Sequence, residues 1–100
     1  MTVKLGDRES KLETELVRRV RASGGRAEKL QAVGRRGWFD RLVTLPGGRV
    51  IFVEMKRPRG GRLSAHQILR ASTYRRLGAE VALISLPEQI DELLRDYLVK

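Results

Sequence analysis

The sequence predicts a single α/β domain over residues 1–100, with a mixed central sheet flanked by helices. Three observations predict this class. With 41% apolar residues, the 100-residue chain can bury one core and no more. Apolar side chains recur at the helical period in some segments and form short strand-like runs in others. The order of these segments gives two hairpin-like connections and then a helical crossover, so one sheet should contain antiparallel and parallel pairs.

The first expected element is an amphipathic helix over residues 8–23. Its apolar side chains fall on one stripe: Leu12, Leu16, Val17 and Val20. Asp7 is expected as the N-cap of this helix, and the glycine pair at 24–25 is expected to end it.

Three strands are expected next. Residues 26–33 form the first strand, and residues 38–45 form the second after a turn or loop at 34–37. Pro-Gly-Gly at 46–48 is a hairpin turn that leads into the third strand, residues 49–56. The third strand is apolar on both faces, which is typical of a central strand that is covered on both sides.

The second half of the chain is expected to supply the crossover and a last helix. Ser64 and Gln67 fit a capping box for a helix that stops at Gly78. Residues 79–85 form a fourth strand that is apolar enough to be internal. Pro87 opens the last helix. That helix is expected to bury one stripe of side chains: Ile90, Leu93, Leu94 and Tyr97.

Charge and composition narrow the functional class. Lysine and arginine number 21 against 12 acidic residues, which gives a formal net charge of +9. A small domain this basic is typical of nucleic-acid binders, because each neutralised phosphate releases a counterion; a solubilising surface is the alternative. The chain has no cysteine, no apolar run of about 18 residues and no signal-like N-terminus. We therefore expect a cytoplasmic protein that is neither secreted nor embedded in a membrane.

Charged residues interrupt the third strand where it should be buried. Glu54 and Lys56 share one face of this strand, because side chains alternate along it. Taken alone, this pair is more often a salt bridge at the rim of a sheet. Asp40 changes the interpretation, since counting outward from the hairpin turn places it opposite Glu54. Facing carboxylates repel each other, and a bound cation is the simplest reason to keep them together.

The first helix offers a further acid. Glu13 lies in the middle of the apolar stripe, and Glu9 lies one turn earlier on the same side. Glu13 is therefore a candidate to join the acids of the sheet. The other interpretation is a partly exposed acid stabilised by the helix macrodipole, and this is favoured when Glu13 is considered alone.

Together these residues suit metal-dependent hydrolysis of a phosphodiester. Carboxylate oxygens beside open coordination positions suit Mg²⁺ or Mn²⁺, which keep water ligands and bind substrate phosphate. Such a metal polarises the phosphoryl oxygen and prepares a water or hydroxide for attack. Lys56 is placed to orient or deprotonate that water and to stabilise the developing charge.

The motifs also resemble a known family. Asp40 followed by VEMK resembles the D…(D/E)xK signature of the PD-(D/E)xK nuclease superfamily. The longer context, GWFDRLVTLPGGRVIFVEMKRPRGGRLSAHQ…LGAEVALI, is similar to its VRR-NUC family, the virus-type replication-repair nucleases. The likeness runs from Glu13 to about Leu86 and implies a restriction-endonuclease-like αβββαβ core.

The resemblance implies a role for each matching residue. Asp40 and Glu54 would ligate Mg²⁺ or Mn²⁺. The backbone carbonyl of Met55 would be a third ligand, and Lys56 would be the catalytic lysine. Glu13 would lie near the metal and act through water.

Four further positions carry expectations of their own. Gln67 corresponds to a glutamine near the family's active site, although a capping box explains this residue equally well. Phe39 stands where the family usually has proline, which puts the path of the second strand in doubt. Trp38 either stacks on a base or belongs to the core or a dimer interface. His66 is expected at the surface, at a helix start.

The resemblance and the charge together predict a metal-dependent endonuclease for branched DNA, of Holliday-junction or flap type, acting in replication, recombination or repair. Arginines of the loops and the first helix should steer phosphate: Arg35, Arg36, Arg57, Arg59, Arg62, Arg18 and Arg19. The resemblance also implies a homodimer in a bacterial or phage-infected cell, with the last helix as candidate interface. Two alternatives are a non-catalytic nucleic-acid-binding module on the same fold and a subunit that needs another chain for activity.

Overall fold

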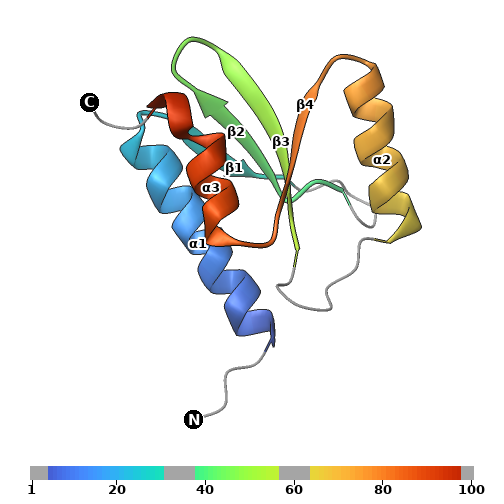
Figure 1. The fold of residues 1–100 in the computed structure, drawn as a ribbon, viewed down its shortest axis with the longest axis horizontal. Coiled ribbons are helices and arrows are strands. Elements are labelled where there is room, and N and C mark those ends of the chain that lie inside the picture. Colours follow the sequence, from blue (N-terminus) through green and yellow to red (C-terminus); the bar gives the residue numbers. More distant parts are fainter. Residues whose placement is uncertain (1–4, 31–37, 57–63, 98–100) are drawn as a thin grey trace.

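The computed structural model describes residues 5–30, 38–56 and 64–97, with side chains from Lys11 onward, and arranges them as helices on both faces of one sheet (Figure 1). The helices are α1 (Leu5–Ala22), α2 (Ala65–Arg76) and α3 (Pro87–Leu93), followed by the short 3₁₀ helix η1 (Arg95–Tyr97). The strands are β1 (Arg26–Lys29), β2 (Arg41–Leu45), β3 (Arg49–Met55) and β4 (Glu80–Ile84). The element order confirms the predicted α/β class.

The sheet has the strand order β1-β2-β3-β4. The first two pairs are antiparallel and the pair β3–β4 is parallel, so the sheet is mixed, as predicted. β3 lies between two partners, which agrees with its apolar faces. The prediction that β4 is internal is wrong, because β4 is the edge strand of this sheet. Its apolar composition has another cause: helices cover both of its faces, with Val81 packed on one side and Ile84 on the other.

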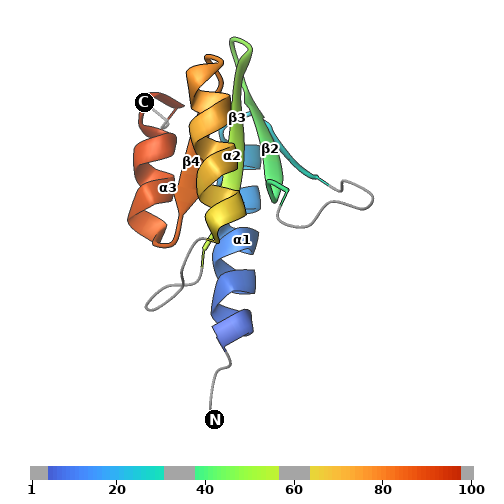
Figure 2. The same ribbon diagram turned by 90° about the vertical axis from the view of Figure 1, so that its right-hand side faces the viewer.

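Two hydrophobic clusters separate the layers. α1 and α3 cover one face of the sheet, and α2 alone covers the other face, as Figure 2 shows. The cluster under α1 and α3 contains the largest buried set, including Leu16, Val20, Ile51, Val53, Ile90 and Leu94. The stripe of α3 is thus buried within its own chain, as predicted, and an interface on the exposed residues of the last helix stays a prediction. The cluster under α2 is smaller and aromatic, built on Phe39, Ala71 and Val81.

Several element boundaries differ from the predicted ones. α1 begins at Leu5, so the prediction of Asp7 as N-cap is wrong; residues 5–7 contain no proline and the helix continues through them. β1 ends at Lys29, and the predicted loop at 34–37 lies outside the described residues. β2 begins at Arg41 rather than at residue 38, because the Phe39 ring is buried beneath α2 instead of alternating across the sheet.

Glycine ends α1 as predicted. Gly24 has a φ of +89°, and the N–H of Gly25 donates to the Val20 carbonyl at 2.9 Å, which is a Schellman motif. The capping box of α2 and the proline at the start of α3 are also confirmed. Within the described ranges, no helix combines the length and the apolar character needed to cross a membrane.

Candidate active site

Asp40 and Glu54 lie side by side at the end of the β2–β3 hairpin that is remote from its turn. The ladder pairs Arg41 with Val53, so the next pair outward is Asp40 with Glu54. The Asp40 N–H donates to the Val53 carbonyl at 3.0 Å, and Asp40 Oδ2 accepts from the Met55 N–H at 2.7 Å. The register thus brings together the two carboxyl groups that counting from the turn places opposite each other.

Burial perturbs both carboxyl groups, and the charge of Asp40 perturbs Glu54 further. Glu54 is only 3% exposed. Burial, and after it the charge of Asp40, raises the pKa of Glu54 to about 8. Burial also raises the pKa of Asp40, although the hydrogen bond from the Met55 N–H opposes this rise. Around neutral pH the pair therefore shares a proton unless a positive charge takes its place.

Gln67 connects α2 to the acid pair. Its Nε2 donates to Glu54 Oε1 at 2.9 Å, and its Oε1 accepts from the Ser64 N–H at 2.8 Å. A backbone N–H can only donate, so this contact fixes the amide with Nε2 toward Glu54. The Gln67 N–H in turn donates to Ser64 Oγ at 3.1 Å. One side chain thus caps the helix and holds the buried carboxyl group, and the two interpretations of Gln67 are compatible.

Met55 and Lys56 lie at the end of β3. The Met55 N–H points to Asp40, and because the N–H and C=O of a strand residue project to the same edge, its carbonyl lies on that edge too. The Lys56 N–H donates to the Ile84 carbonyl of β4 at 2.8 Å. Alternation along β3 puts the half-exposed Lys56 side chain on the face of Glu54.

Glu13 faces the sheet, but it is bound to a cationic side chain. Its Oε2 accepts from Arg41 Nε at 2.7 Å, and Arg41 also donates to the Ala27 carbonyl at 3.1 Å. The charge of Glu13 also contributes to the raised pKa of Asp40. Among the described residues no three acids, histidines or cysteines are grouped so that they could hold one metal ion. Glu13 therefore lies beside the acid pair without completing a three-carboxylate cluster.

An aromatic cluster closes the site on the α2 side. Phe39 is buried, with its ring 4.8 Å from Phe52 and 5.5 Å from Tyr74. Trp38 packs against the same cluster, 5.7 Å from Tyr74, and the Arg70 guanidinium lies 5.2 Å from the Trp38 ring centre. Of the two roles considered for Trp38, the geometry favours packing over base stacking.

Two arginines near the acids were missed by the sequence analysis. Arg70 follows Gln67 by one helical turn, and its charge opposes the rise in the pKa of Glu54. Arg41 follows Asp40 and alternates to the α1 face, where it meets Glu13. The helical spacing from Gln67 could have identified Arg70, and the alternation of side chains along β2 could have identified Arg41.

Two of the seven arginines predicted to contact DNA lie within the described residues. Five of them lie outside the described residues: Arg35, Arg36, Arg57, Arg59 and Arg62. Arg18 pairs with Glu15 at 2.6 Å, and Arg19 pairs with Asp91 of α3 at 2.5 Å. Both follow Glu13 along α1, toward the hairpin-turn end of the sheet and away from the acid pair. His66 is exposed in the first turn of α2, as expected.

An αβββαβ domain with two acids and a lysine at the ends of its second and third strands defines a nuclease fold of the restriction-endonuclease type. No family model matches the chain. Over 77 residues it is 43% identical to "Putative nuclease p44" of Acyrthosiphon pisum secondary endosymbiont phage 1, covering 77% of this chain and 82% of that protein. A solved structure described as "VRR_NUC domain" matches with a TM-score of 0.82 and 33% identity, over 91% of this chain and 98% of the other. The chain belongs to the VRR-NUC family of nucleases.

Replacing Glu54 by glutamine should stabilise the metal-free protein increasingly as the pH rises. Because the pKa of Glu54 is raised from 4.5 to about 8, the folded state holds a proton that the unfolded state releases within that interval. Wild-type stability therefore falls as pH rises through it, by at most about 1.4 kcal/mol per pH unit for one proton. Urea unfolding in EDTA between about pH 4 and pH 8 measures this slope. Equal slopes for wild type and Glu54→Gln would contradict the assignment.

Two variants distinguish a Gln67 that both caps α2 and holds Glu54 from a Gln67 that only caps α2. Ser64→Ala removes the hydroxyl acceptor of the cap and should cost about 1 kcal/mol of stability without changing the response to a divalent metal. Gln67→Ala also removes the donor to Glu54 and should weaken metal binding by about 10-fold or more. Thermal unfolding during a Mn²⁺ titration measures both effects. The same loss of metal response in both variants would show that Gln67 acts only as a cap.

Proposed function

We propose that this nuclease is a Mg²⁺- or Mn²⁺-dependent deoxyribonuclease that cuts branched DNA. The observation that carries the proposal is the pairing of the half-buried Asp40 with the buried Glu54 at the strand ends of a nuclease fold. Two carboxyl groups whose pKa values are both raised are unfavourable to the fold, and a divalent cation between them would remove their repulsion.

The donor set fits a hard divalent cation. Carboxylate oxygens of Asp40 and Glu54, with the carbonyl of Met55, would supply three oxygen ligands from the protein and leave the other positions to water and substrate phosphate. The described donors include no cysteine or histidine in this group, which argues against a zinc-type site. A cation held there would polarise the phosphoryl oxygen and lower the pKa of a bound water.

The remaining side chains support that role. Gln67 orients Glu54 by its hydrogen bond. Lys56, on the same face of β3, is assigned to the attacking water and to the charge that develops on the phosphate. Glu13 is assigned an indirect part, through water or through Arg41, which its salt bridge holds next to Asp40. Lys56 and the acid pair would act at the reacting atoms, whereas Gln67 and Glu13 would position them.

DNA is the substrate that the charge of the chain favours. A net charge of +9 on 100 residues suits a polyanion, and the phage relative carries the name of a nuclease. Branched DNA, of junction or flap type, is the proposed form, with the loop arginines of segments 34–37 and 57–62 contacting its phosphates. The proposed setting is DNA replication, recombination or repair in the cytoplasm of a bacterium or phage-infected cell.

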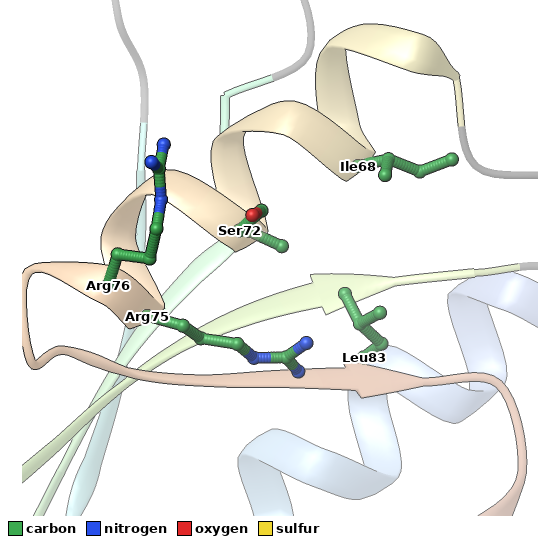
Figure 3. A pocket seen from close by; sticks show the side chains of 6 residues that line it. Ile68, Ser72, Arg75, Arg76 and Leu83 are labelled. Atoms are coloured by element: carbon green, nitrogen blue, oxygen red, sulfur yellow. The ribbon is translucent and has the colours of Figure 1, made fainter.

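A homodimer is part of the proposal, with its interface on α2 and β4. α2 exposes Ile68 and Leu69, the latter to 62%, whereas Ala71 of the same helix is buried against the sheet. A groove of about 420 Å³ runs between this helix and the edge strand, with Ile68 above Leu83 and Arg75 at its end (Figure 3). An apolar groove beside an unpaired strand edge suits a second copy of the chain. A twofold axis there would present two acid pairs to a four-way junction.

Removing Asp40 or Lys56 should abolish cutting and preserve DNA binding. Asp40→Ala and Lys56→Ala are expected to lower the cleavage rate at least about 100-fold, because each removes a group assigned to the reacting atoms. Their affinity for DNA in EDTA should stay within about threefold of wild type, since most of the proposed phosphate contacts come from other residues. Gel assays with four-way, flapped, nicked and linear DNA in Mg²⁺, Mn²⁺ or EDTA provide the measurement.

Two outcomes of these assays would favour the alternatives. Equal loss of binding and cutting in both variants favours a non-catalytic binding module. Wild-type protein that binds branched DNA but cuts none of it with either metal favours a subunit that requires another chain.

The dimer interface has a matched pair of test variants. Leu69→Asp places a charge on the proposed interface of α2 and should shift the protein to monomer in sedimentation velocity. Leu86→Asp changes a leucine that is also exposed but precedes α3, and it should leave the oligomeric state unchanged. A dimer that survives Leu69→Asp, or a monomeric wild type, excludes this interface.

A further inference from the structure

A positively charged pocket, separate from the acid pair, lies between α1 and β1. An open pocket of about 580 Å³ is lined there by three arginines, Arg21, Arg26 and Arg41, together with Glu28. None of these arginines belongs to the loops or to the part of α1 from which DNA contacts were predicted. The pocket is on the α1 side of the sheet, whereas the acid pair faces α2.

The three arginines differ in how firmly they are held. Arg41 is 19% exposed, and its bonds to Glu13 and to the Ala27 carbonyl fix the plane of its guanidinium. Those bonds engage two of its five N–H groups. Arg26 is 82% exposed and lies 3.9 Å from Glu28, a separation at which a surface ion pair contributes little. A fixed inner arginine and exposed outer ones suit a ligand that enters from solvent.

The walls of the pocket are set by backbone packing. A Cβ atom at Gly25 would lie 2.5 Å from the Thr44 carbonyl oxygen, so only glycine lets the end of α1 approach β2 this closely. Gly24, with its positive φ, reverses the chain from α1 into β1. Arg21, in the last turn of the helix, and Arg26, at the start of the strand, are thereby placed on opposite sides of one short connection.

The pocket is within reach of DNA bound at the acid pair. Arg41 is the neighbour of Asp40 in the chain, and Arg26 pairs with Thr44, four positions further along β2. At about 3.3 Å per residue, the pocket extends to roughly 13 Å from Asp40 along the strand. A DNA strand advances about 3.4 Å per nucleotide. For DNA whose axis follows β2, a phosphate about four nucleotides from the acid pair would lie level with Arg26.

We propose that this pocket binds the phosphodiester backbone of the DNA substrate at a second point, beyond the scissile phosphate. The proposal rests on the proposed function, because it places the cut strand at the acid pair. Three guanidinium groups against Glu28 and Glu13 leave a net positive lining, and arginine forks match phosphate oxygens. Contacts of this kind fix the register of the DNA without reading its sequence.

The test compares two double variants with equal loss of charge. Arg21→Gln/Arg26→Gln changes two exposed arginines of the pocket, and Lys11→Gln/Arg95→Gln changes two exposed cations elsewhere. DNA affinity is measured by fluorescence anisotropy in EDTA, with a labelled duplex, between about 50 and 200 mM salt. The pocket variant should lower the slope of log K against log salt by about 1.8, for two lost phosphate contacts, with kcat on saturating DNA unchanged. The control variant should change the slope by less than about 0.5.

Four results would overturn the inference. An unchanged slope in the pocket variant, with cutting intact, removes this site and leaves the nuclease assignment standing. An equal change in both variants assigns the effect to overall charge. The wild type could bind inorganic phosphate saturably while the pocket variant does not. If the salt slope for DNA is then the same in both, the pocket binds a free anion and not DNA. A wild type that binds no DNA even at low salt would overturn the proposed function as well.

Discussion

The structure is organised around two carboxyl groups that its hairpin places side by side. The register of β2 and β3 brings together the buried Glu54 and the half-buried Asp40. Burial favours the protonated form of both groups, and the charge of Asp40 favours it further in Glu54. Three neighbouring groups oppose these effects in part. The Met55 N–H donates to one acid, Gln67 donates to the other, and the positive charge of Arg70 favours the ionised form of Glu54. The fold is therefore less stable when both acids are ionised and no further positive charge lies beside them.

Local rules in the sequence predicted most of the hairpin and its acid pair. The turn at 46–48 and the two-residue alternation of β3 determine which residues face each other, so counting from the turn was sufficient for Asp40 and Glu54. The glycine stop of α1 and the Ser64–Gln67 box were predictable for the same reason, since each depends on a few consecutive residues. The family resemblance added the roles of these residues, which geometry alone does not supply.

The features that the sequence did not reveal depend on long-range packing. β4 is apolar because helices cover both of its faces, and composition cannot distinguish such an edge strand from an internal one. β2 starts late because Phe39 is drawn into the aromatic cluster under α2. The pairing of Arg19 with Asp91 and of Arg41 with Glu13 joins residues far apart in the chain. The buried stripe of α3 was predictable from its helical period, but the helix α1 that lies beside it was not.

The hydrogen bond from the Lys56 N–H to the Ile84 carbonyl makes the end of β3 depend on a strand that comes later in the chain. During synthesis, Asp40, Glu54 and Lys56 are all made before β4. The end of β3 gains its parallel partner only after α2 and β4 have emerged, because a parallel pair requires the whole crossover. A nascent or prematurely terminated chain that stops before β4 therefore carries every charged group of the D…ExK signature without the carbonyl that holds the Lys56 backbone in place.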